Sequence, residues 1–200
     1  MNRGKLIALE GIDGCGKSTQ GARLVEALRA DGHDVVATRE PTDGVTGRRI
    51  RAMARSGKRV PAFEELGWFF EDRREHVAEV IEPALAAGRT VVTDRYFLST
   101  VAYQGARGLD WREILARSEA EFPLPDVALL FVLPAEAGLA RVQARGAPTD
   151  PVFEEADFLA KVASIFAELD LPYLARIDAS GDVDEVAERT RTALAENFRA

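Results

Sequence analysis

Residues 11–18 read Gly-Ile-Asp-Gly-Cys-Gly-Lys-Ser and decide the fold, because they match the pattern G-x-x-x-x-G-K-S/T. The short apolar run 6–9 precedes this stretch, and Leu24, Val25 and Leu28 follow it at helical spacing. A strand, a glycine-rich loop and a helix in this order form a phosphate-binding loop, whose backbone N–H groups point at phosphate oxygens. The alternative is a glycine-rich turn without a ligand, but the complete pattern seldom arises by chance in a chain of this length.

Two side chains of this loop carry separate expected roles. Lys17 can reach the β- and γ-phosphates of a nucleoside triphosphate, and the hydroxyl of Ser18 can ligate Mg²⁺. We therefore predict that ATP binds at the loop and the residue after it, namely Gly11, Ile12, Asp13, Gly14, Cys15, Gly16, Lys17, Ser18 and Thr19.

Outward from the loop, apolar strands alternate with helices along the whole chain. We expect strands at residues 5–10, 34–38, 90–94, 126–133 and 173–178. We expect helices at 17–30, 48–55, 61–87 with a kink at Pro83, 111–121 after Asp110 as N-cap, 135–144, a segment that ends at 169, and from 182 onward. This alternation predicts one α/β domain over residues 1–200, with a five-stranded parallel sheet and helices on both faces.

Composition and charge exclude several classes of protein. The longest apolar run, Val127 to Leu133, is far too short to cross a bilayer, and Glu10 comes too early for a secretory signal, so we expect a cytoplasmic protein without a membrane partner. The net charge of −7 argues against a broad nucleic-acid surface. One cysteine and two histidines cannot supply a cysteine- or histidine-rich metal site, so any metal must be held by oxygen.

The residues that follow the other strands narrow the class of nucleotide-binding protein. A GTPase needs an Asn-Lys-x-Asp motif, which the sequence lacks. Instead, residues 38–41 read Thr-Arg-Glu-Pro, residues 94–96 read Asp-Arg-Tyr, and residues 99–105 read Ser-Thr-Val-Ala-Tyr-Gln-Gly. With the segment Phe-Phe-Glu-Asp-Arg at 69–73 and His76 after it, these motifs closely resemble the thymidylate kinase family over residues 5–145.

The resemblance implies a P-loop NTPase fold, a short lid at about residues 141–155, and transfer of the γ-phosphoryl group of Mg-ATP to dTMP, which gives dTDP and ADP. It also implies a homodimer. Asp94 ends a strand near the phosphate loop, where its carboxylate can join Ser18 in holding Mg²⁺, and Arg95 beside it can grip a phosphate. We predict catalytic roles for Lys17, Arg95 and Asp13.

The acceptor nucleotide is expected on the side chains of several motifs. Phe69 and Arg73 are four residues apart and share one helix face, so that a ring can stack on a base while a guanidinium donates to its carbonyl. By resemblance, Tyr103 lies near C2′ of the sugar, Asp13 and Glu40 contact the sugar or tune the metal, and Arg51 reaches the acceptor phosphate. The full predicted set is Arg39, Glu40, Arg51, Phe69, Arg73, Arg95, Ser99, Thr100, Tyr103 and Gln104.

The chain departs from the family pattern at two places. Family members place an arginine on the migrating phosphoryl group, either in the phosphate loop after the residue that matches Asp13 or in the lid. Here Gly14 and Pro151 stand at those positions, so we assign the role to Arg141 and Arg145. Residues 42–44 read Thr-Asp-Gly where the family has Gly-Gly-Thr, and Asp43 should weaken phosphate binding unless it turns outward.

These departures leave two alternatives open. The first is a kinase of another (deoxy)nucleoside monophosphate on the same scaffold. The second is a catalytically inactive regulatory paralogue that binds nucleotides, supported by the missing lid arginine. Retention of Lys17, Asp94 and Arg95 argues against the second alternative.

Overall fold

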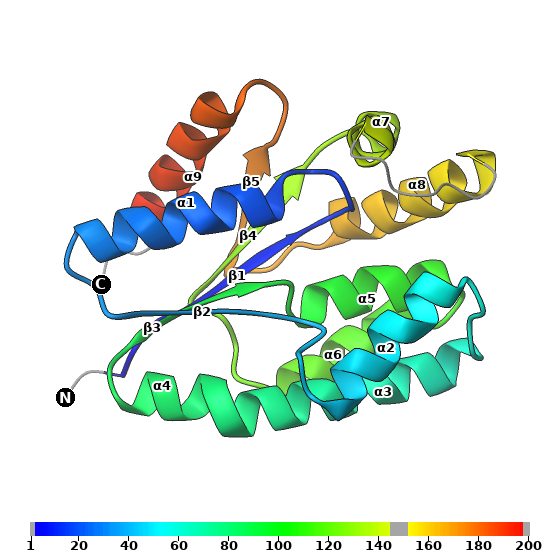
Figure 1. Cartoon of the computed structure of the whole chain (residues 1–200), viewed down its shortest axis with the longest axis horizontal. Coiled ribbons are helices and arrows are strands. Elements are labelled where there is room, and N and C mark those ends of the chain that lie inside the picture. The colour runs from blue at the N-terminus through cyan, green and yellow to red at the C-terminus, as the bar shows by residue number, and fades with distance from the viewer. Residues whose placement is uncertain (1–2, 145–151, 198–200) are drawn as a thin grey trace.

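The computed structural model describes residues 3–144 and 152–197, with the backbone only for residues 152–155. A five-stranded sheet runs through its centre in the order β2-β3-β1-β4-β5 (Figure 1). All neighbouring strands are parallel, as predicted. The strands are β1 (Leu6–Gly11), β2 (Val35–Arg39), β3 (Thr90–Asp94), β4 (Val127–Val132) and β5 (Leu174–Asp178).

Helices cover both faces of this sheet, which explains why its central strands β1 and β4 are apolar apart from Glu10. In Figure 1, α1 (Lys17–Ala30) and α9 (Val183–Asn197) lie on one face. The other face carries α3, α4, α5 and α6, with α2 packed on α3 and α8 packed on α5. The bounds are α2 (Val45–Ser56), α3 (Ala62–His76), α4 (Glu82–Ala86), α5 (Phe97–Ala106), α6 (Trp111–Glu121), α7 (Ala135–Ala144) and α8 (Val152–Glu168). None of the described helices is long and apolar enough to span a membrane.

Capping residues begin two of the helices. The Asp110 carboxylate accepts the backbone N–H of Arg112 at 2.9 Å, as predicted for the start of α6. At the start of α9, Asp182 accepts the N–H groups of Asp184 and Glu185, while the Glu185 carboxylate accepts the N–H of Asp182. This reciprocal pair satisfies backbone donors that a helix end otherwise leaves free.

The long helix predicted at 61–87 is interrupted by a π-helical turn, Val77–Ile81, which joins α3 to α4. In this turn the N–H of Glu82 donates to the carbonyl of Val77, five residues back. Pro83 then stands in the first turn of α4. The irregularity therefore precedes the proline at which a kink was expected.

Helix α5 was missed by the sequence-based prediction. Its residues include Phe97, Leu98, Val101 and Ala102, which are all buried, as are the hydroxyls between them. The helix is enclosed by β1, α6 and α8, so it has no polar stripe to mark a helical period. The same enclosure lets α5 present polar side chains to a cavity inside the molecule.

Candidate active site

The carboxyl ends of β1, β2 and β3 bring the predicted polar residues to one edge of the sheet. The pairing sets Leu9 beside Asp94 and Arg39 beside Asp94. The phosphate loop after β1 therefore lies next to the residues that follow β2 and β3. Two adjoining cavities open at this edge, of about 350 Å³ and about 220 Å³.

The larger of these, the phosphate-loop cavity, contains most of the predicted ATP-binding residues: Asp13, Gly14, Gly16, Lys17, Ser18 and Thr19. The Lys17 ammonium is enclosed by its own loop, where it donates to the carbonyl of Ile12 at 2.9 Å and lies 3.7 Å from the sulfur of Cys15. Burial, with the charge of Arg95, lowers the pKa of Lys17. The ammonium is thus poorly neutralised, as suits a group that receives an anionic phosphate.

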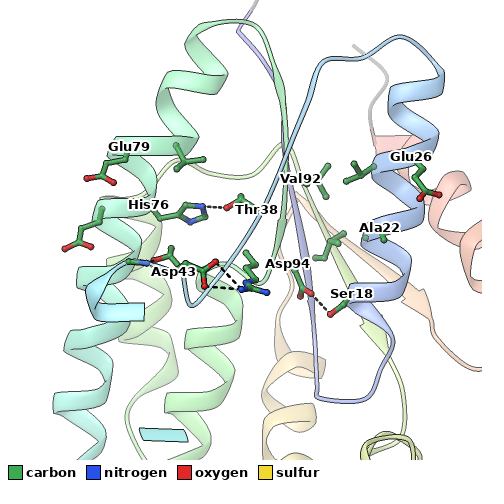
Figure 2. A pocket seen from close by; sticks show the side chains of 18 of the residues that line it. Ser18, Ala22, Glu26, Thr38, Asp43, His76, Glu79, Val92 and Asp94 are labelled. Atoms are coloured by element: carbon green, nitrogen blue, oxygen red, sulfur yellow. Dashed lines mark hydrogen bonds and ion pairs between the residues drawn. The ribbon is translucent and has the colours of Figure 1, made fainter. Parts of the chain in front are cut away.

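Ser18 and Asp94 lie together at the floor of this cavity. The Ser18 hydroxyl donates to Asp94 Oδ2 at 2.6 Å, a bond drawn in Figure 2. A hydroxyl and a single carboxylate are hard oxygen donors of the kind Mg²⁺ prefers, and they leave further coordination positions for phosphate oxygens and water. Within residues 3–144 and 152–197 no cluster of three or more histidines, cysteines or carboxylates could hold a metal by itself.

Arg95 stands where the two cavities meet, together with Asp13 and Glu40, which line both. Its Nη2 donates to Asp13 Oδ1 at 2.6 Å, and the phenol of Tyr103 donates to Asp13 Oδ2 at 3.0 Å. The surrounding protein disfavours the charge of Asp13, but Arg95 and Lys17 hold the pKa of this carboxyl below its ordinary value. Burial raises the pKa of the Tyr103 phenol, so it stays neutral and donates.

The smaller cavity, the acceptor cavity, gathers nine of the ten predicted acceptor residues: Glu40, Arg51, Phe69, Arg73, Arg95, Ser99, Thr100, Tyr103 and Gln104. They come from the end of β2, from α2 and α3, from the end of β3, and from α5. Arg39 is not part of this lining and instead borders the phosphate-loop cavity. Phe69 and Arg73 both belong to α3 and both line this cavity, in keeping with the shared helix face that their spacing predicts.

A buried ion cluster holds Arg73 in this wall. Glu40 Oε2 accepts from Arg73 Nε at 2.9 Å and from Nη2 at 2.6 Å, and Arg73 Nη2 also donates to Thr100 Oγ1 at 2.9 Å. The other Glu40 oxygen lies 3.0 Å from His76 Nδ1, while His76 Nε2 lies 2.7 Å from Thr38 Oγ1. Both Glu40 oxygens are therefore engaged, and its expected contact with a sugar stays a prediction.

Three buried polar atoms of residues that line the acceptor cavity lack a hydrogen-bond partner among the described residues: Arg73 Nη1, Gln104 Oε1 and Glu65 Oε2. Of these, Glu65 Oε2 is engaged in an ion pair with Arg107. The orientation of Gln104 follows from its neighbour, because its amide nitrogen donates to Glu65 Oε1 at 3.3 Å and a carboxylate can only accept. Glu65 is itself buried. The cavity thus contains one unused donor and one unused acceptor, which are expensive to bury unless a ligand satisfies them.

Sequence reasoning missed Glu65, His76 and Glu10 as parts of the site. Glu65 precedes Phe69 and Arg73 by four and eight residues, so the same helical spacing that linked those two could have indicated it. His76 was noted only as a neighbour of the motif. Glu10 gave no signal, because it sits in a strand whose other residues are apolar.

Asp43 turns outward, which removes the repulsion expected from it in the acceptor cavity. Its carboxylate accepts from Arg39 Nη2 at 3.1 Å and from Arg51 Nη2 at 2.7 Å, and the Asp43 side chain is 74% exposed. The hydrogen bond from Arg39 lowers the pKa of Asp43. Asp43 therefore engages two of the arginines that were predicted to bind the acceptor.

The predicted lid is described only in part. Arg141 Nη1 donates to the carbonyl of Ala179 after β5 at 3.3 Å, and Val142 beside it borders the phosphate-loop cavity. Arg145, Pro151 and the stretch between them lie outside the described residues. After this stretch, α8 places the ring of Phe158 edge-on to that of Tyr103, at 6.0 Å between centroids, so α8 contacts a residue of the acceptor cavity. The role assigned to Arg141 and Arg145 stays a prediction.

A wider groove of about 820 Å³ lies between α1, β2 and the π-helical turn. Figure 2 shows Glu26 and Ala22 of α1 on one side and Glu79 on the other, with Thr38 and His76 between them. The groove shares Ser18, Arg39 and Asp94 with the phosphate-loop cavity, so it is an open approach to that cavity.

Comparisons with known proteins indicate the same family over most of the chain. The family model described as thymidylate kinase matches residues 9–190. A thymidylate kinase of Desulfotalea psychrophila is 48% identical over 186 residues, which cover 92% of this chain and 91% of the relative. Thymidylate kinases of Xanthomonas euvesicatoria (49% over 192 residues, 96% and 83% covered) and Xanthomonas campestris (46% over 201 residues, 98% and 87% covered) are similar to it as well.

Proposed function

The chain belongs to the thymidylate kinase family, and on that premise we propose that it transfers the γ-phosphoryl group of ATP to dTMP, giving dTDP and ADP. The observation that carries the choice of a thymine- or uracil-type base over cytosine is the pair of unused atoms in the acceptor cavity, the donor Arg73 Nη1 and the acceptor Gln104 Oε1. Thymine offers a carbonyl oxygen at C4 and an N–H at N3 on one edge, which complements this pair. Cytosine presents an amino donor and a bare ring nitrogen there, so it would meet donor with donor and acceptor with acceptor.

The remaining contacts of dTMP follow from the walls of the cavity. Phe69 supplies a ring for stacking on the base, as the sequence predicted. The phenol of Tyr103, fixed by Asp13, closes the sugar end and leaves little room for a 2′-hydroxyl. Arg95 and Arg51 provide guanidinium groups for the 5′-phosphate, the first of them at the junction with the phosphate-loop cavity.

Transfer then depends on positioning and charge rather than on covalent chemistry by the protein. The loop amides and Lys17 hold the β- and γ-phosphates of ATP, and Arg95 holds the acceptor phosphate across the junction. Ser18 and Asp94 would hold Mg²⁺, which neutralises charge on the transferred phosphoryl group. Closure of the lid, residues 141–155, would exclude water and limit ATP hydrolysis, and either Arg141 or Arg145 would then approach the phosphates.

The same proposal covers the setting in which the enzyme works. We place it in the cytoplasm, as one domain over residues 1–200 that acts as a homodimer. We assign it ATP, dTMP and Mg²⁺ as ligands and neither nucleic acid nor membrane as a partner. The net charge of −7 supports the absence of nucleic acid.

Product formation from a panel of acceptors tests this function. The protein is incubated with Mg-ATP and dTMP, dUMP, dCMP, dGMP, UMP or AMP, and diphosphate formation is followed, with Lys17→Ala as the inactive control. We expect dTMP to be preferred, and dCMP to be rejected strongly. Preferential turnover of another monophosphate would overturn the choice of acceptor, and binding of both nucleotides without product would favour the regulatory alternative.

One substitution tests whether Gln104 binds the base of the acceptor nucleotide. Gln104→Leu removes the unused acceptor, and we expect kcat/KM for dTMP to fall about 10- to 100-fold, because the N3–H of thymine is left without a partner. The affinity for ATP should not change. Equal losses with every acceptor would contradict the assignment of Gln104 to the base.

A further inference from the structure

Glu10 is a fully buried carboxylate in the central strand β1, with an exposed fraction of 0%. The residues before it, Leu6 to Leu9, are apolar and equally buried. A carboxylate in such surroundings is costly unless hydrogen bonds hold it, so its partners indicate what it does. Glu10 has two such partners: its Oε1 accepts the backbone N–H of Tyr96 at 3.0 Å, and its Oε2 accepts the hydroxyl of Ser99 at 2.5 Å.

The first contact secures an unusual piece of backbone. Arg95 has a φ of 72°, and no other residue except glycine has a positive φ in the described part of the chain. Side chains with a Cβ seldom adopt this conformation, which persists only where surrounding contacts enforce it. The N–H of Tyr96 belongs to the peptide directly after Arg95, so Glu10 fixes this peptide from inside the sheet. The N–H of Arg95 is held in turn by the carbonyl of Leu9 at 2.9 Å.

The second contact reaches the Arg95 side chain. Ser99 Oγ accepts from Arg95 Nη1 at 3.0 Å while its own hydrogen goes to Glu10. The other terminal nitrogen of Arg95 donates to Asp13 Oδ1. A continuous chain of hydrogen bonds thus runs from Glu10 through Ser99 and Arg95 to the phosphate loop.

We propose that Glu10 is a positioning residue for Arg95, holding both its strained backbone and its guanidinium so that the guanidinium lies at the junction of the two cavities. The inference rests on the proposed function for its effect on turnover, because it assumes that phosphate is transferred at this junction. The geometric part of the inference does not depend on the proposed function. Glu10 touches neither nucleotide and acts only through Tyr96, Ser99 and Arg95.

The test compares Glu10→Gln with a matched control, a carboxylate that accepts a backbone N–H at the other end of β1. The glutamine side chain would keep the size and could still accept the Tyr96 N–H, but its amide nitrogen would present a donor to Ser99, which disrupts the link to Arg95. The control is Asp126→Asn, since Asp126 accepts the N–H of Leu6 at 2.8 Å at the far end of β1. Both variants should lose some thermal stability.

Turnover separates a positioning role from a structural one. We expect Glu10→Gln to lower kcat for dTMP about 10- to 100-fold at saturating substrates with little change in the KM for ATP, because a small displacement of a phosphate-binding group is costly in the transition state. Asp126→Asn should keep kcat within about twofold of wild type at a similar loss of Tm. If both variants have wild-type kcat, or both lose it equally at equal loss of Tm, the proposal is overturned.

A second measurement does not depend on turnover. The ¹⁵N–¹H signals of the Arg95 guanidinium and hydrogen exchange of the Tyr96 amide report the geometry directly, and both should change in Glu10→Gln and not in Asp126→Asn. Ser99→Ala should change the guanidinium signals but leave the Tyr96 amide protected. If the wild type makes no dTDP, the proposed function fails alone, whereas unchanged Arg95 signals in Glu10→Gln would overturn the positioning role.

Discussion

The phosphate-loop cavity and the acceptor cavity meet at Arg95 but are built in different ways. The first is made mostly by one continuous stretch, residues 13–19, much of it glycine and backbone. The second is made by side chains that approach from several elements far apart in the sequence. One loop can bind phosphate by its local conformation alone, whereas the acceptor cavity needs a buried network to keep its side chains in place. The two cavities should therefore respond differently to substitution.

The largest effect is expected in the acceptor network. Glu40→Gln leaves Arg73, with an exposed side-chain fraction of only 1%, without its carboxylate, and breaking such a buried pair costs about 3–5 kcal/mol of unfolding free energy. The exposed pair of Arg89 with Asp34 is the matched control, since Asp34→Asn should cost less than about 1 kcal/mol. Urea denaturation measures both. Equal losses would show that burial of the network is not what distinguishes the acceptor side.

In the phosphate-loop cavity we expect a large loss of rate with little loss of stability. Lys17→Met removes the ammonium that faces the phosphates and should lower kcat about 10²- to 10³-fold. Because burial already disfavours the charge of Lys17, the variant should unfold at the same or a higher temperature than the wild type. Steady-state rates and thermal melts test this. A strong drop in the Tm of Lys17→Met would contradict the expected difference in stability between this variant and Glu40→Gln.

The free energy of unfolding should depend on pH through Glu10, which contacts Arg95 indirectly at the boundary of the two cavities. Burial raises the pKa of its carboxyl from 4.5 to about 7, although the hydrogen bond from Ser99 and the charge of Arg95 oppose this. Between these values the folded chain binds a proton that the unfolded chain has released, so stability falls as the pH rises. The loss amounts to at most about 3 kcal/mol. Urea titrations at a series of pH values measure the unfolding free energy of the wild type and of Glu10→Gln. From pH 4.5 to above 7, the wild type should lose this amount relative to the variant. If the unfolding free energies of both proteins change with pH in parallel, the expectation is refuted.

The smallest effect is expected at the exposed rim. Asp43→Asn releases Arg39 and Arg51 from a competing carboxylate, so the KM for dTMP should fall about twofold at low salt, and the difference should vanish at high salt. Asp178→Asn, at an exposed pair with Arg189, is the control and should change neither KM nor its salt dependence. A rise in KM would mean that Asp43 orients the two arginines instead of competing for them.

The difference between the two cavities also explains which features the sequence could predict, because one cavity is formed by a local stretch and the other by distant elements. The phosphate loop, helix 17–30 and strand 90–94 were predicted with their observed bounds, because glycine spacing and apolar runs are local signals. The family resemblance is confirmed by the comparisons, and nine of the ten residues that it assigned to the acceptor line one cavity. The partners of Glu10, Glu65 and His76 could not be predicted, since they arise from contacts between elements distant in the chain. Helix α5 was missed for the related reason that burial on all sides hides a helical period.

The π-helical turn at Val77–Ile81 limits where this chain can gain or lose residues. Upstream of it, α3 directs Arg73 to the acceptor cavity. The last residue of the turn, Ile81, and Leu85 of α4 pack in the core at 0% and 2% exposure. Removing one residue between Arg73 and Leu85 would turn the downstream segment by about 100° about the helix axis, and Leu85 would leave its place. In an alignment of relatives, gaps should therefore avoid residues 73–85 and collect in connections such as 57–60. An insertion tag or a split of the chain would be tolerated in the latter segment first.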